Sequence, residues 1–222
     1  MTMVRSSFRG LREGFSDKAI SIRCVRDDQS AVTVKLYYLN NGSARVGFWT
    51  RGREYLLPVG IVLKALKKST DHEIYVALTC VYAAGSEGVR GVVGTQLVGE
   101  RAKIIRDELH GLSLLTHDQC LEHIGKYFRP VMDGYKNKEL KVVGNAVLDN
   151  FIFVHLKTNE DKFNLLIFMV QKLFSLVDET SVPDNHDALQ NQEVLLAGQM
   201  IAIVLKAKLE DWLSSVRRGL MK

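Results

Sequence analysis

Residues 52–66 read Gly-Arg-Glu-Tyr-Leu-Leu-Pro-Val-Gly-Ile-Val-Leu-Lys-Ala-Leu, and the pattern of the chain changes within them. Up to Leu57 the residues suit the end of a strand. The apolar residues that follow have the three-to-four-residue spacing of a helix: Val59, Val62, Leu63 and Leu66. Pro58 suits a first helical turn, because its missing N–H is not needed there. We therefore predict strands before Pro58 and helices after it.

Upstream of this stretch the sequence predicts a small antiparallel sheet over residues 19–57. Residues 19–25 and 31–39 alternate between apolar and polar, with β-branched and aromatic side chains that favour strands. Asn41-Gly42 is a strong hairpin signal, since both residues tolerate positive φ. A third strand is predicted at 44–49. Residues 1–18 are basic and rich in Ser and Gly, so we expect a flexible lead-in or the remnant of an adjoining structure.

Downstream, helical periodicity dominates. The predicted helices cover 59–66, a segment beginning near 71, and then 96–109, 116–127, 139–150, 162–177 and 192–217. Thr116 with Gln119 three residues later forms a capping-box pattern. The glycine-rich residues 83–94 and the segment 178–189, which contains Pro183, are predicted loops. The expected fold class is α+β, a small N-terminal antiparallel sheet (19–57) followed by a mainly helical part (58–217).

The composition is that of an ordinary globular protein. The chain has 222 residues, 46% hydrophobic and 25% charged, with a formal net charge of +5. Three dispersed cysteines do not make a disulfide framework and favour a reducing compartment. The first 18 residues lack the apolar segment of a signal peptide, and the apolar runs are too short for a transmembrane helix. We expect a soluble intracellular protein without membrane contact.

No motif in the sequence predicts catalysis. A phosphate-binding glycine motif is absent, and no cluster of carboxylates has the spacing of a two-metal site. His117-x-x-Cys120-x-x-His123 is the nearest approach to a metal site, but structural zinc usually has four N or S ligands. We expect His117 to be exposed instead. The sequence thus predicts neither metal nor cofactor, and no catalytic residue within this chain.

Basic and aromatic residues gather around the second predicted hairpin. The arginines are Arg45, Arg51 and Arg53, and the aromatic residues are Phe48, Trp49 and Tyr55. Such a set can bind nucleic acid through phosphate contacts and stacking. Alternatively, the aromatic side chains belong to the core and the arginines form a solvated edge that prevents strand addition. Physical chemistry alone favours the second interpretation.

Several stretches resemble one protein family. Residues 52–66, the Asp-His-Glu-Ile-Tyr step at 71–75, the helical stretch 161–173 and the loop 183–195 are similar, in this order, to segments of the second-largest subunits of eukaryotic RNA polymerases. In this loop, Gln190-Asn191-Gln192 stands where the polymerase II and III homologues have Lys-Arg. The loop sequence therefore resembles that of polymerase I. Residues 23–30 resemble the plant sequences in particular.

The resemblance implies a role in transcription of ribosomal RNA genes. Residues 19–217 would form the lobe domain, which is expected to line the DNA cleft and to dock the largest and the peripheral subunits. It also implies a location in the nucleus, specifically the nucleolus. The candidate contacts to duplex DNA are Arg45, Arg51, Arg53, Lys136 and Lys138, the last two in a polar loop. The family's catalytic residues lie outside the matched stretches. The alternative is a free-standing interaction module derived from such a subunit, without a DNA role.

Overall fold

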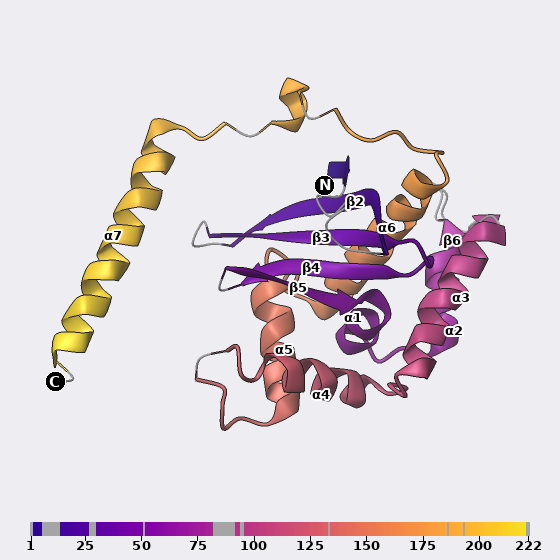
Figure 1. Cartoon of the computed structure of the whole chain (residues 1–222), viewed down its shortest axis with the longest axis horizontal. Coiled ribbons are helices and arrows are strands. Elements are labelled where there is room, and N and C mark those ends of the chain that lie inside the picture. The colour runs from indigo at the N-terminus through magenta and orange to yellow at the C-terminus, as the bar shows by residue number, and fades with distance from the viewer. Residues whose placement is uncertain are drawn as a thin grey trace. The chain divides into compact units, whose positions relative to one another are not determined.

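The computed structural model describes residues 2–5, 14–26, 30–50, 52–81, 92–93, 96–132, 134–185, 187–192 and 194–220 (Figure 1). The chain divides into two compact units, 1–184 and 185–222, and each is described by itself. The first unit contains the sheet and six helices of the described part. The second contains one long helix, which follows a short 3-10 turn.

Five strands form one antiparallel sheet in sequence order: β1 (Thr2–Arg5), β2 (Phe15–Val25), β3 (Ala31–Leu39), β4 (Ala44–Thr50) and β5 (Arg53–Pro58). The predicted turn at Asn41-Gly42 joins β3 to β4, and Gly42 has the positive φ of +87° that such a turn needs. The sheet begins earlier than the sequence predicts. Residues 2–5 and 15–18 were assigned to the lead-in, but β1 pairs with β2, with Val4 opposite Ala19.

The helices of the first unit follow, close to their predicted positions: α1 (Val59–Leu66), α2 (Asp71–Thr79), α3 (Gln96–Gly111), α4 (His117–Phe128), α5 (Leu140–Phe151) and α6 (Asn159–Val177). The predicted α+β class is therefore confirmed. A two-stranded ribbon, β6 (Cys80–Val81) and β7 (Val92–Val93), occupies part of the predicted glycine-rich loop. The other residues of that loop lie outside the described part of the chain.

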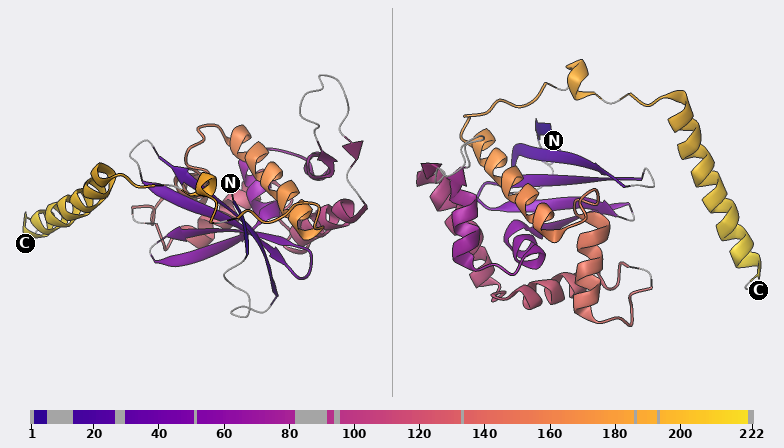
Figure 2. Two further views of the ribbon diagram at one scale, coloured as in Figure 1. Left: turned by 90° about the horizontal axis from the view of Figure 1, so that it is seen from above. Right: turned by 180° about the vertical axis from the view of Figure 1, so that it is seen from behind.

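The core lies between the sheet and the helices. Val34, Leu36, Val46 and Phe48 share one face of the sheet and are fully buried. Helix α6 crosses this sheet in the view from behind, and α1 lies beside β4 and β5 (Figures 1 and 2). The ring of Phe48 stacks on Phe128 of α4 and Phe151 of α5, with centroid distances of 5.5 and 5.4 Å. One hydrophobic core thus joins the strands to all six helices of the first unit.

Helices α4 and α5 approach each other closely at two glycines. A Cβ atom on Gly125 of α4 would stand 2.0 Å from the carbonyl oxygen of Leu140. A Cβ on Gly144 of α5 would stand 2.4 Å from the carbonyl oxygen of Leu121. Both obstacles are backbone atoms, which cannot turn aside as a side chain can. The contact therefore requires glycine at each of the two positions.

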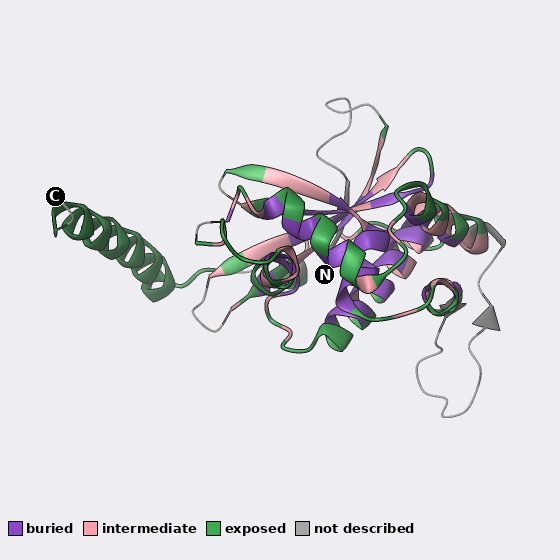
Figure 3. Ribbon diagram, turned by 90° about the horizontal axis from the view of Figure 1, so that it is seen from below, coloured by how far each residue is buried: buried purple, intermediate pink, exposed green. Residues whose placement is uncertain are grey.

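The second unit consists mainly of α7 (Ala197–Leu220), after a 3-10 turn at Leu189–Asn191. No residue of α7 is buried, and the helix is green along its whole length in Figure 3. Apolar side chains recur along one face at helical spacing: Ile201, Leu205, Leu209, Trp212 and Val216. Arg217 and Arg218 stand in the last turn, where the helix dipole favours cations. Among the described residues, no helix has the length and apolarity that a bilayer crossing requires.

Candidate functional site

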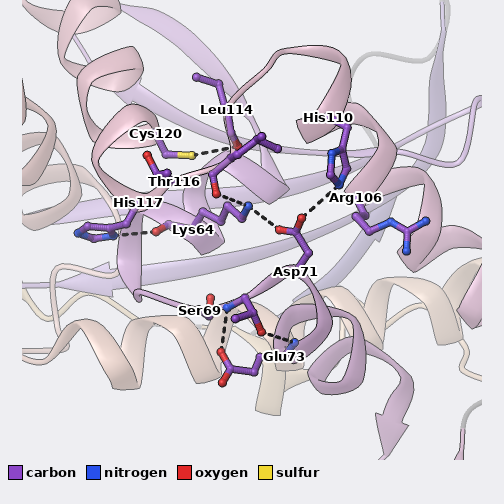
Figure 4. Close-up of polar contacts among 12 residues, drawn as sticks. Lys64, Ser69, Asp71, Glu73, Arg106, His110, Leu114, Thr116, His117 and Cys120 are labelled. Atoms are coloured by element: carbon purple, nitrogen blue, oxygen red, sulfur yellow. Dashed lines mark hydrogen bonds and ion pairs between the residues drawn. The ribbon is translucent and has the colours of Figure 1, made fainter.

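A buried lysine lies at the junction of α1, α2 and α3. The side chain of Lys64 is only 3% exposed, although it is the one charged residue in the sequence of α1. Its Nζ donates a hydrogen bond of 2.7 Å to the carbonyl oxygen of Leu115 and forms an ion pair with Asp71 at the start of α2 (Figure 4). Burying a charge is costly unless it is paired and hydrogen-bonded, and both conditions are met here.

Asp71 also contacts a histidine. Its Oδ2 lies 3.1 Å from Nε2 of His110, near the end of α3. The two residues line a hollow of about 530 Å³ together with His72, Tyr75, Arg106 and Asp107. A carboxylate that orients an imidazole is also found in catalytic triads. The second carboxylate oxygen, however, faces the ammonium of Lys64, so Asp71 joins three helices through its contacts with Lys64 and His110.

The same junction extends to the start of α4. Nδ1 of His117 lies 2.8 Å from the carbonyl oxygen of Lys64. The predicted capping box is present, because Thr116 accepts from the backbone N–H of Gln119 while the Gln119 side chain accepts from the N–H of Thr116. Helix α2 begins in the same way, with Thr70 and Glu73 bonded reciprocally. These contacts satisfy the free N–H groups of both helix starts and hold the junction together.

The His117-x-x-Cys120-x-x-His123 pattern does not form a metal site in the structure. His117 is half-buried against α1, Cys120 is buried with its thiol 3.9 Å from the carbonyl oxygen of Leu114, and His123 is exposed. His117 was expected to be exposed and is instead bonded to the Lys64 carbonyl. Within the part of the chain that the structure describes, no group of three His, Cys, Asp or Glu side chains is close enough to hold a metal ion.

Two cysteines are buried and free, Cys24 on β2 and Cys120 on α4. Burial raises the pKa of each thiol to about 11, because a thiolate would lose its hydration. Since the thiolate is the nucleophile, neither thiol is suited to catalysis at neutral pH. Cys120, the cysteine drawn in Figure 4, is therefore not an activated nucleophile. The polar contacts drawn there connect helices to one another.

A thiol-labelling experiment tests this assignment. In a Cys80→Ser variant, the two remaining thiols should react with a disulfide reagent at about pH 8 at least ~10²-fold more slowly than a free cysteine. After denaturation both should react at once. Fast labelling of either thiol in the folded variant would contradict the burial, and the Cys24→Ser and Cys120→Ser variants would identify which one reacts.

The predicted DNA contacts are not brought together into one cluster. Arg45 on β4 forms an ion pair with Glu108 of α3, and both side chains are largely buried. Arg51 lies outside the described residues. Arg53 is exposed at the start of β5. Of the aromatic residues beside them, Phe48 lies in the core, as the structural interpretation expected, but Trp49 is exposed.

Lys136 and Lys138 lie in the loop between α4 and α5, and both are exposed. Nζ of Lys138 stands 4.2 Å from the centroid of the Tyr135 ring, a cation–π contact. Lys136 lines a surface hollow of about 720 Å³ with Lys126, Arg129, Pro130 and Leu140. Lys126 and Arg129 are not among the residues predicted from the sequence. Their signal was a pair of basic residues on either side of two aromatic ones, Lys126-Tyr127-Phe128-Arg129, at the predicted end of a helix.

An apolar groove of about 640 Å³ runs between α2 and α6. Its lining includes Leu78, Val98, Phe163, Ile167 and Phe168. The ring of Phe168 is 47% exposed, and Nζ of Lys172 lies 5.7 Å from its centroid. A large aromatic side chain that remains half in water at a groove is typical of a protein-binding surface.

Comparisons with known proteins give one consistent result. The sequence model described as "RNA polymerase Rpb2, domain 2" matches residues 12–195. The chain is 61% identical over 212 residues to DNA-directed RNA polymerase I subunit 2 of Arabidopsis thaliana, covering 96% of the chain and 18% of that protein. Identity is 37% over 216 residues to a probable polymerase I subunit of Schizosaccharomyces pombe, and 36% over 224 residues to subunit RPA135 of Saccharomyces cerevisiae. In both cases the matched region includes 97% of the chain and 18% of the relative. The chain therefore spans about a fifth of the length of these curated relatives.

Proposed function

Because the chain belongs to the RNA polymerase Rpb2 domain 2 family, we propose that it acts as the lobe of the second-largest subunit of RNA polymerase I. The observation that carries the proposal is the match to this domain over residues 12–195, together with polymerase I relatives along nearly the whole chain. In this role the domain lines the cleft that receives duplex DNA and docks other subunits in the nucleolus. The chemistry of nucleotide addition belongs to other parts of the enzyme.

Two features of the structure support a scaffolding role. Lys64, Asp71 and His110, the polar residues that most resemble an active site, are engaged in joining helices. Of the predicted DNA contacts, Arg53, Lys136 and Lys138 are exposed at a strand start and in a loop, where they can meet phosphates by charge alone.

The test is replacement of the matching segment of the Arabidopsis subunit by residues 12–195 of this chain. The hybrid subunit would be co-expressed with the remaining polymerase I subunits, and the complex purified through the largest one. We expect the hybrid to co-purify in stoichiometric amount. A hybrid that is folded and soluble but absent from the complex would refute the proposal and leave the free-standing interaction module as the better account.

For docking, we propose that the groove between α2 and α6 accepts an apolar side chain of another polymerase subunit. A Phe168→Glu variant should assemble about tenfold less well, because a carboxylate would be desolvated in the contact. Val142→Glu on α5 is the matched control, since Val142 is also an exposed apolar residue on a helix. Both variants should keep the melting temperature of the parent. Equal recovery of subunits by the two variants would remove the groove from the proposal.

A further inference from the structure

The hollow at the end of α4 is lined by cations from two segments. Lys126 and Arg129 come from α4 and its last turn, Lys136 comes from the following loop, and Leu140 is the first residue of α5. Nε of Arg129 donates a hydrogen bond of 2.5 Å to the carbonyl oxygen of Lys136. This bond fixes the loop against the helix, so that the three cationic residues line one hollow with a volume of about 720 Å³.

Among the described residues, the cations of this hollow have no acidic partner. Within the described residues, no carboxylate lies within ion-pair distance of Lys126, Arg129 or Lys136. The nearest acids along α4, Asp118 and Glu122, contact Lys141 instead, at 3.0 and 3.8 Å. That contact lowers the pKa of the Asp118 carboxyl, through its hydrogen bond to Lys141. Asp133 lies outside the described residues. Residues 126–141 contain five basic and two acidic residues in all.

The surroundings suit a nucleic acid better than a single small anion. Tyr127 follows Lys126 in α4 and is 54% exposed, and its ring meets that of Tyr55 edge-on at 6.2 Å. Arg53 lies two residues from Tyr55 at the start of the same strand. Lys138, over the Tyr135 ring, extends the basic surface along the loop. In addition, the N-cap residue of α5, Glu139, makes no side-chain hydrogen bond to the helix start, and the first turn has no acidic residue. Its first N–H groups thus favour an anion.

We propose that this hollow binds the phosphate backbone of duplex DNA, with Lys126, Arg129 and Lys136 as the contacting residues. The proposal rests on the proposed function, because it names the point at which the domain holds the DNA of the cleft. It also extends the set of candidate contacts. Lys126 and Arg129 join Lys136, whereas Arg45 already pairs with Glu108 and lies outside this hollow.

The test uses the full chain and a fluorescein-labelled duplex of random sequence, followed by fluorescence anisotropy at several salt concentrations. The variant Lys126→Glu/Lys136→Glu changes two exposed residues that pair with no acid in the described part of the chain. Its matched control is Lys103→Glu/Lys157→Glu, which makes the same change in net charge at two exposed lysines elsewhere. Arg129 is left in place because it holds the loop through the Lys136 carbonyl.

We expect the hollow variant to bind the duplex about 10–100-fold more weakly, with the slope of log K against log salt reduced by about 2. The control should lose less than about threefold. Equal losses in both variants would overturn the proposal, since net charge alone would then explain binding. Competition by a phosphorylated peptide at lower concentration than by the duplex would also overturn it, in favour of a protein partner. If the hybrid subunit fails to assemble while the hollow variant still loses DNA, the proposed function fails and this inference stands.

Discussion

We expect an Asp71→Asn variant to lose about 3 kcal/mol of unfolding free energy, because the change leaves the ammonium of Lys64 buried without a counter-charge. Asparagine keeps the size of the side chain and one oxygen that can accept a hydrogen bond. The Leu115 carbonyl also remains bonded to Lys64. The loss should therefore fall at the lower end of the ~3–5 kcal/mol range for a broken buried pair. Urea denaturation, followed by circular dichroism, measures it.

A double-mutant cycle separates the ion pair from other effects of the substitution. Lys64→Met should cost about 1–3 kcal/mol, mainly because the Leu115 carbonyl loses its donor. The double variant should be no less stable than Asp71→Asn alone, since no unpaired charge remains buried. Asp107→Asn serves as the control, because Asp107 is an exposed residue of α3 that pairs with its neighbour Arg106. If the losses of unfolding free energy in the two single variants simply add in the double variant, Lys64 and Asp71 act independently. That result would refute a stabilising ion pair between them.

A Gly125→Ala variant is expected to be destabilised by about 3 kcal/mol or more, against a gain of ~1 kcal/mol in helix propensity. The new methyl group would stand 2.0 Å from the Leu140 carbonyl oxygen, so α4 and α5 must move apart. Separation would also disturb the stack of Phe128 and Phe151 on Phe48, which lies at the ends of the same two helices. The melting temperature and the urea midpoint should both fall.

Gly111→Ala is the matched control for this helix contact. Gly111 is the last residue of α3, and nothing lies within 4 Å of the position its Cβ would take. The control should change stability by no more than ~0.5 kcal/mol. If Gly125→Ala were as stable as this control, the close approach of the two helices would not exist in solution.

Much of the fold could be predicted because local patterns and tertiary packing agree. The change of period at Pro58 is confirmed, since β5 ends and α1 begins there. The hairpin turn at Gly42 and the capping box at Thr116 are also confirmed. Each of them depends on residues that are close together in the sequence, so a local pattern is enough to predict it. The pairing of β1 with β2 was missed. A strand of four residues has little periodicity, and only its partner identifies it.

The polar site was harder to predict, because its contacts join residues far apart in the sequence. Lys64 lies in a helix whose eight residues are all buried, so no polar face marked it as special. Its partners come from the next helix and from the loop at Leu115. Similarly, the ion pair of Arg45 with Glu108 joins residues 63 positions apart. A basic residue near an aromatic one looks the same in the sequence whether it faces DNA or a buried carboxylate.

The apolar face of α7 has a consequence for the life of the protein in a cell. A helix gains most of its stability by burying its apolar face, yet none of the residues of α7 is buried. Within the described residues of its own unit nothing covers Ile201, Leu205 and Trp212, and an uncovered apolar segment is of the kind that chaperones bind and proteases remove. The amount of the protein that accumulates should then follow the supply of its binding partners more closely than its own rate of synthesis.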